Sequence, residues 1–176
     1  MKIFYITDVS QLSDFFSDID YAESFIPLTG DISVAYELIK KNVHFLNEWD
    51  FLSNEEIKCN FDLANDISKK WWIEFSSNNL KSDDTFFSTT QQDMVYFFEA
   101  ALNSKTLYSS LFLKYNISEI HGYFLKEQAV IRTGPNPTHR AVRSVAQSVL
   151  FWLCKNKSIP VIQLKSNTSL SIGTLI

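Results

Sequence analysis

The sequence predicts an α/β fold: a Rossmann-like parallel sheet with helices on both faces and a helical insertion at about residues 53–115. Short apolar runs alternate with segments of helical period, and this order is typical of parallel sheets built from strand–helix–strand units. The 176 residues are 45% hydrophobic and 15% aromatic, which is enough apolar material for a core. The length favours one domain over residues 1–176.

The first third of the chain predicts three strands and two helices. The strands are expected at residues 2–7, 24–28 and 43–46, where aromatic and β-branched side chains gather. Between them, apolar residues recur at helical spacing over residues 12–19 and 32–39. Because Pro27 lacks a backbone N–H, the second strand is expected to be short or to lie at a sheet edge.

The middle third predicts two helices separated by a loop. Ser53 and Glu56 have the spacing of a capping box, in which each side chain satisfies an amide at the helix start. The helix that follows is expected to reach about Phe75. Residues 76–89 are polar and predict a loop, and residues 90–114 predict a second helix with a bend near residue 107.

The last third predicts strands around one helix. A strand is expected at residues 117–124, and residues 129–132 extend it or pair with it. Apolar residues stay in helical register from Ala141 to Cys154, so a helix is expected from Thr138 to residues 155–157. A last strand is expected at residues 161–164.

All three arginines lie in the segment that precedes and opens this last helix. Positive charge in the first turn opposes the helix dipole, and a bound anion would offset that cost. Free amides at a helix start and planar guanidinium groups both bind phosphate or carboxylate. The expected ligand-binding residues are Arg132, Thr133, Gly134, His139, Arg140 and Arg143. Alternatively, Arg140 and Arg143 form only surface ion pairs, and His139 is an exposed first-turn residue.

Acidic residues follow the expected strands. In open α/β sheets, ligands bind beyond the carboxyl ends of the strands. Asp8 follows the first strand, Asp31 the second and residues 47–50, including Asp50, the third, so a parallel sheet would bring them to one edge beside the arginines. Asp8 and Asp31 are the candidate catalytic residues, since either could contact an acceptor hydroxyl or act as its base. Alternatively, Asp8 is a turn residue and Asp31 a helix cap.

Composition argues against several classes of function. The net charge of −4 disfavours nucleic acid as a partner, because such binding needs a broad basic surface. The histidines lack metal-ligand spacing and no Gly-rich nucleotide motif is present, so no metal and no cofactor are expected. Cys59 and Cys154 are expected to be buried thiols in a reducing compartment. No run approaches the ~20 apolar residues of a membrane span. We therefore expect a cytoplasmic protein with at most peripheral membrane association.

Residues 132–164 resemble the close of the N-terminal domain of GT-B-type glycosyltransferases and sugar-nucleotide epimerases. There, a strand ends in a loop, a helix of small residues follows, and a strand of the form Ile-Pro-Val returns; here these are residues 132–138, 141–154 and 159–162. Residues 2–8, Lys-Ile-Phe-Tyr-Ile-Thr-Asp, look like that family's first strand and loop. The family's Gly-rich turn at this place is replaced by Asp8-Val9-Ser10.

The resemblance implies the acceptor-side domain of a glycosyltransferase of surface-carbohydrate biosynthesis, with an anionic sugar or a sugar phosphate as acceptor. In such enzymes a second domain holds most of the nucleotide-sugar donor. A second domain or chain would then complete the cleft, and this chain alone would not turn over. A hypothesis from another class is a non-catalytic protein-interaction module with the same fold, whose Phe86 and Phe87 bind a protein partner. Alternatively, these two rings pack back against the core.

Overall fold

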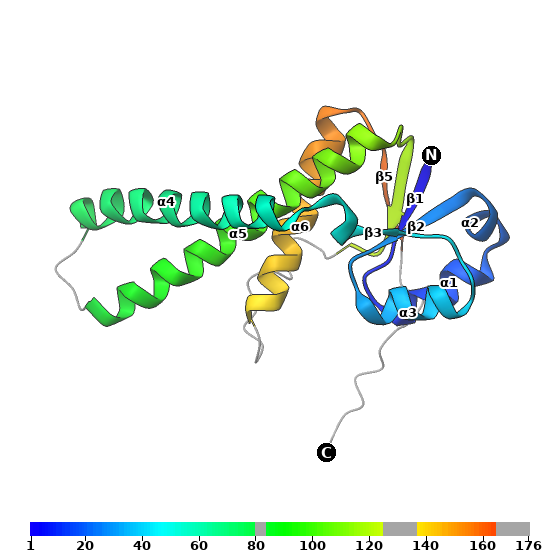
Figure 1. Ribbon diagram of the computed structural model, residues 1–176, viewed down its shortest axis with the longest axis horizontal. Coiled ribbons are helices and arrows are strands. Elements are labelled where there is room, and N and C mark those ends of the chain that lie inside the picture. Colours follow the sequence, from blue (N-terminus) through cyan, green and yellow to red (C-terminus); the bar gives the residue numbers. More distant parts are fainter. Residues whose placement is uncertain (80–83, 125–136, 165–176) are drawn as a thin grey trace, which may run out of the picture.

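The protein has a parallel sheet with a Rossmann-like strand order (Figure 1). The computed structural model describes the backbone of residues 1–79, 84–124 and 137–164, with their side chains except those of residues 19, 75–79, 84–91 and 137–144. Within these residues, five parallel strands pair in the order β3-β2-β1-β4-β5. The strands are β1 (Lys2–Tyr5), β2 (Phe25–Thr29), β3 (Leu46–Asn47), β4 (Glu119–Gly122) and β5 (Val161–Gln163). The chain runs outward from β1 in one direction and then, from β4, in the other, which confirms the predicted fold class.

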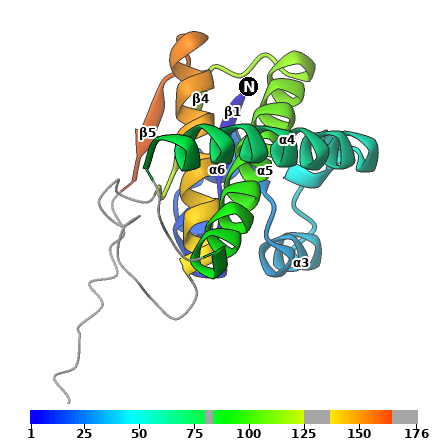
Figure 2. The ribbon, with the colours of Figure 1, turned by 90° about the vertical axis from the view of Figure 1, so that its left-hand side faces the viewer.

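Helices cover both faces of the sheet, as predicted. They are η1 (Val9–Gln11), α1 (Leu12–Ser17), α2 (Ile19–Ser24), α3 (Ile32–Lys40), η2 (Glu48–Phe51), α4 (Asn54–Asn79), α5 (Asp84–Lys114) and α6 (Pro137–Asn156), where η marks a short 3-10 helix. Successive side chains of a strand point to opposite faces. Ile3 and Tyr5 of β1 pack with α5 and α6, whereas Phe4 and Ile6 pack with α1 and α3. Figure 2 shows α5 and α6 side by side across β1 and β4.

The second strand is short, as expected, but it does not lie at an edge, because β2 pairs with both β1 and β3. The Leu28 carbonyl accepts a hydrogen bond from the Ile6 amide at 2.9 Å, so the polar groups of Leu28 face β1. Those of the preceding residue, Pro27, therefore face β3. Pairing with β3 begins only at Leu28, opposite Leu46, so the missing N–H of Pro27 falls before that ladder.

The expected loop at residues 76–89 is wrong at residues 76–79 and 84–89, which are helical. Helix α4 continues to Asn79 and α5 begins at Asp84, and α5 runs as one helix through residue 107; residues 80–83 lie outside the described part. The segment contains neither glycine nor proline, so its polar composition alone did not end either helix. The two helices contact each other through Asn60, whose amide donates to Asn103 Oδ1 at 2.9 Å and Thr106 Oγ1 at 3.2 Å. Among the described residues, every helix is too short or too polar to span a lipid bilayer.

The two cysteines differ in burial. Cys154 is buried on α6, as expected, and burial raises the pKa of its thiol to about 12. Cys59 is exposed on α4, so the expectation of a second buried thiol is wrong. The difference follows from packing, since α6 shares a core cluster with strand residues while α4 contacts mainly α5.

Candidate functional site

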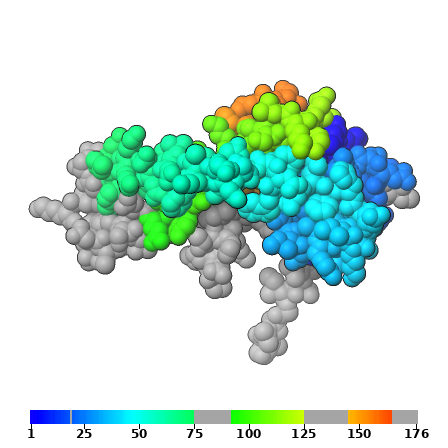
Figure 3. Space-filling view, viewed as in Figure 1, coloured from blue at the N-terminus to red at the C-terminus, as the bar shows by residue number. Residues whose placement is uncertain are grey.

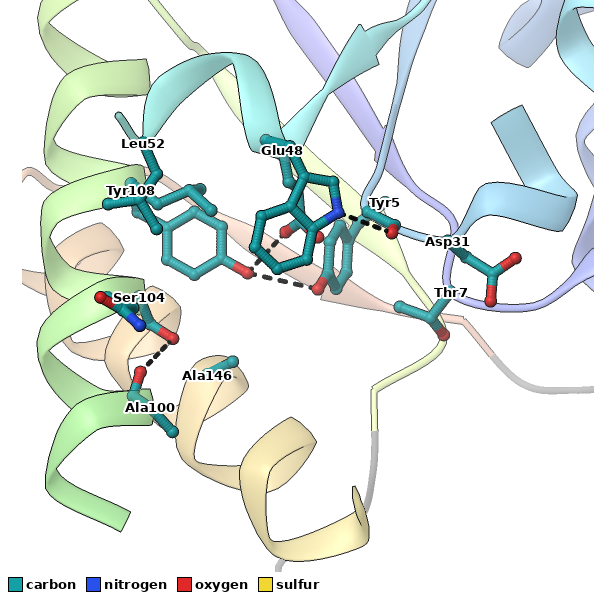
Figure 4. Close-up of a pocket in the computed structure, with 13 residues that line it drawn as sticks. Tyr5, Thr7, Asp31, Glu48, Leu52, Ala100, Ser104, Tyr108 and Ala146 are labelled. Atoms are coloured by element: carbon teal, nitrogen blue, oxygen red, sulfur yellow. Dashed lines mark hydrogen bonds between the residues drawn. The ribbon is translucent and has the colours of Figure 1, made fainter. Parts of the chain in front are cut away.

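A cavity of about 400 Å³ lies at the carboxyl ends of three neighbouring strands (Figure 4). Its wall includes Tyr5, the last residue of β1, Gly30 and Asp31, which follow β2, and Glu48, which follows β3. Side chains of α5 and α6 form the facing wall. The cavity therefore occupies the edge at which open parallel sheets bind ligands.

A chain of hydrogen bonds holds a carboxylate in this cavity. The hydroxyl of Tyr108 donates to Glu48 Oε1 at 2.8 Å, and the hydroxyl of Tyr5 lies 3.2 Å from that of Tyr108. Because Tyr108 gives its single proton to Glu48, Tyr5 must be the donor to Tyr108. Burial, and next the charge of Glu48, raises the pKa of Tyr108 well above its usual value. Tyr108 therefore stays protonated at neutral pH and remains a donor to the carboxylate.

Gly30 allows this carboxylate to approach the turn after β2. A methyl group at Gly30 would collide with Glu48 Oε2, so only glycine leaves room for the observed position. The Gly30 carbonyl also accepts a hydrogen bond from the indole Nε1–H of Trp49 at 3.0 Å. Trp49 lines the cavity and is 58% exposed. The site thus presents a carboxylate and a largely exposed indole from consecutive residues.

The two predicted catalytic acids both have structural roles. Asp31 lines the cavity and caps α3, because its Oδ1 accepts from the amides of Ser33 at 2.9 Å and Val34 at 3.0 Å. Asp8 is exposed and caps η1, with its Oδ1 2.8 Å from the Ser10 amide and 2.6 Å from the Ser10 hydroxyl. Asp8 is not among the residues that line the cavity. The cap and turn interpretations are therefore confirmed, and a catalytic role for either residue stays a prediction.

The predicted anion-binding residues fall largely outside the described part of the chain. Arg132, Thr133 and Gly134 lie outside the described residues. His139, Arg140 and Arg143 belong to the first two turns of α6, and their side chains are outside the described part. Ala146, one turn further along α6 than Arg143, lines the cavity. The helix that the arginines open therefore contributes to the site, and anion binding stays a prediction.

Sequence reasoning missed Glu48, Trp49 and Tyr108. It reached residues 47–50 as a strand end but named Asp50, which is exposed and is not among the cavity-lining residues. The available signal was position, since Glu48 is the first residue after β3. No local pattern pointed to Tyr108, which is 60 residues away from Glu48.

No protein-family model, no curated protein sequence and no solved structure matches this chain. Within the described residues, no three histidine, cysteine, aspartate or glutamate side chains are grouped so that they could hold a metal ion. The function must therefore be inferred from the cavity itself.

Proposed function

We propose that this chain is the acceptor-side domain of a GT-B-like glycosyltransferase of surface-carbohydrate biosynthesis, and that its cavity binds a sugar or sugar phosphate. The observation that carries the proposal is a cavity at the carboxyl edge of a Rossmann-like sheet that contains both a fixed carboxylate and an exposed indole. This edge is where ligands of such folds bind. The cavity volume of about 400 Å³ suits a small ligand.

The lining fits the chemistry of a sugar ring. A sugar presents O–H donors around its rim and C–H groups on its faces. The carboxylates of Glu48 and Asp31 accept hydrogen bonds and cannot donate them when ionised. The ring of Trp49 offers apolar surface for a C–H face. Both kinds of contact are available in one cavity.

The resemblance and the arginine cluster support the phosphate part of the proposal. Arg140 and Arg143 belong to the start of α6, and Ala146 of the same helix lines the cavity. A phosphate bound at that helix start would interact with the dipole and with guanidinium groups. One ligand with a sugar ring and a phosphate would bind both regions, the ring in the cavity and the phosphate at the start of α6.

The test is titration calorimetry with a panel of monosaccharides and their 1-phosphates. The wild-type protein is expected to bind a sugar phosphate, and Arg140→Ala with Arg143→Ala is expected to abolish that binding. Ala146→Phe fills the cavity and should remove binding of phosphorylated and plain sugars alike. Ala35→Phe on α3, outside the cavity lining, is the matched control and should bind as the wild type does. Unchanged binding in the double arginine variant and in Ala146→Phe would reject the proposal.

A second function, a protein-interaction module, is favoured by the projecting helix pair. Large apolar side chains on α4 and α5 are 42% to 65% exposed, and α4 forms a long stretch of the surface in Figure 3. They are Phe61, Leu63, Ile73, Tyr96 and Phe97, and Leu113 near the end of α5 is 84% exposed. Phe86 and Phe87 belong to the first turn of α5, and their side chains lie outside the described part. This function would be supported if the double variant Phe61→Ser with Phe97→Ser no longer binds a protein partner that Ala146→Phe still binds.

A further inference from the structure

We infer that Trp49 determines which sugars the cavity accepts: its indole binds one face of a sugar ring and thereby selects pyranosides that have a face free of axial oxygen atoms. This inference rests on the proposed function, since it requires that the cavity binds a sugar. It names the substrate class by the shape of the ring, whereas the proposed function requires only that a sugar or sugar phosphate binds.

The indole of Trp49 is anchored at the turn after β2. Its Nε1–H donates to the Gly30 carbonyl at 3.0 Å. The backbone amide of Trp49 donates to Asn47 Oδ1 at 3.2 Å, so the short helix η2 that carries Trp49 is capped at its start. A side chain that is held in one orientation loses little conformational freedom when a ligand binds. Trp49 is therefore preorganised to bind a flat surface.

The indole offers an apolar surface to the cavity. Its Nε1–H is its single hydrogen-bonding group, and the Gly30 carbonyl accepts that hydrogen. Trp49 lines the cavity and is 58% exposed, whereas the two tyrosines of the described lining, Tyr5 and Tyr108, are 4% and 1% exposed. Among the aromatic residues of that lining, Trp49 thus has by far the largest exposed fraction. A ligand that covers the ring removes this apolar surface from water.

The facing wall of the cavity leaves room for a sugar ring. The residues that α5 and α6 contribute to it include Ala100, Ser104 and Ala146, all with short side chains (Figure 4). The cavity volume is about 400 Å³. This volume lies within the range of pockets that bind small ligands, so a single sugar ring fits beside the indole.

The faces of a sugar ring decide whether it can lie against a flat indole. A face that carries only axial C–H groups is apolar and can contact the indole over its whole area. An axial hydroxyl on that face would point at the indole and hold the sugar ring away from it. That hydroxyl would also lose its hydrogen bonds to water, and the indole face offers no acceptor of equal strength. Pyranosides with an axial hydroxyl on each face should therefore bind more weakly.

The closing experiment compares methyl β-glucopyranoside with methyl β-altropyranoside by titration calorimetry and NMR. The two compounds have the same atoms, but the glucoside has no axial oxygen and the altroside has an axial hydroxyl on each face. The wild-type protein should prefer the glucoside by about tenfold. The axial protons of the bound glucoside should also shift upfield, because the indole ring current shields protons above its face.

Two variants of Trp49 separate a flat ring from mere apolarity. Trp49→Leu keeps an apolar side chain without a flat ring, so it should abolish both the preference for the glucoside and the upfield shift. Trp49→Phe keeps a smaller flat ring and should retain a reduced preference. Trp152→Leu is the matched control, because Trp152 is 55% exposed on α6 and is not among the cavity-lining residues. This control should bind both glycosides as the wild type does, and circular dichroism shows whether each variant is folded.

Three results would overturn the inference: equal binding or no binding of the two glycosides by the wild type, an unchanged preference in Trp49→Leu, or no upfield shift in the wild-type complex. The last of these needs no variant. The proposed function would still stand if the panel of monosaccharides and 1-phosphates contains a ligand that Ala146→Phe no longer binds. If the wild type binds no member of that panel, the proposed function fails too.

Discussion

Both edges of the sheet carry acidic side chains, and at the amino edge an acidic side chain lies beside basic ones. Near the amino ends of the strands, Lys2 Nζ lies 2.7 Å from Glu119 Oε1, and His121 Nε2 lies 3.3 Å from Glu119 Oε2. The other ring nitrogen of His121 lies 3.3 Å from the hydroxyl of Tyr21. At the carboxyl ends, the described cavity lining contains the acids Glu48 and Asp31 and no basic side chain.

The size of a depression does not by itself separate a stabilising cluster from a candidate site. The amino edge also has a depression, of about 480 Å³, which is larger than the cavity of about 400 Å³ at the carboxyl edge. Its Glu119 interacts with Lys2 and His121, and these contacts contribute to stability. The carboxylate of Glu48 accepts a hydrogen bond from the Tyr108 hydroxyl and lines the cavity.

The largest expected effect on stability compares two glycines of the carboxyl edge. A Cβ at Gly122, the last residue of β4, would lie 3.0 Å from both the Tyr5 carbonyl oxygen and the Phe124 ring. Gly122→Ala should therefore destabilise the fold by about 1–3 kcal/mol, because backbone must shift. Gly30→Ala meets only the side chain of Glu48 and should cost about 1 kcal/mol or less, mainly through the hydrogen bond from Tyr108. Urea unfolding measures both, and equal losses would contradict the view that Gly30 serves the site rather than the fold.

An intermediate effect is expected from alkaline pH. Burial raises the pKa of Tyr108 well above 10.0, and burial with the charge of Asp18 raises that of Tyr21 less. Above pH 10 the unfolded phenol ionises and the folded one does not, so stability that is complete below pH 10 is lost as pH rises. The slope is at most about 1.4 kcal/mol per pH unit for each group. Unfolding midpoints at pH 8 to 11 should show that Tyr108→Phe flattens this decline more than Tyr21→Phe does. The reverse ranking would contradict the larger rise in pKa at Tyr108, at the carboxyl edge, than at Tyr21, at the amino edge.

The smallest effect is expected at the amino edge. The hydrogen bond from Lys2, followed by that from His121, lowers the pKa of Glu119 from its usual 4.5. A lowered pKa stabilises the fold above pH 4.5, and that stability is lost as pH falls through the folded value. Lys2→Ala should cost less than about 1 kcal/mol at pH 7, since the pair is partly exposed, and nothing once Glu119 is protonated. Unfolding at pH 7 and pH 3 tests this. Lys2→Ala should also leave the affinity for sugars unchanged. A loss of affinity would show that the amino edge contributes to ligand binding.

Local patterns predicted most of the regular elements, but α2 was not expected, and the third strand, expected at residues 43–46, forms at Leu46–Asn47. The capping box formed as expected, with Glu56 Oε2 2.8 Å from the Ser53 amide and the Glu56 amide 3.2 Å from Ser53 Oγ. The alternation of apolar residues in β1 placed Ile3 and Phe4 on opposite faces. The central position of β2 and the continuation of α4 through residues 76–79 were missed, because neighbouring elements decide where a proline or a polar run is tolerated.

The sequence by itself determined the α/β class, the parallel order of strands and helices, and the helix start at Ser53, because each depends on side-chain period or on contacts within a few residues. Only the tertiary structure decided which acid serves the cavity. Glu48 was selected over Asp50 because α5, anchored by the fully buried Leu111, brings Tyr108 across 60 residues to its carboxylate. Long-range packing sets that contact, and no local spacing in the chain encodes it.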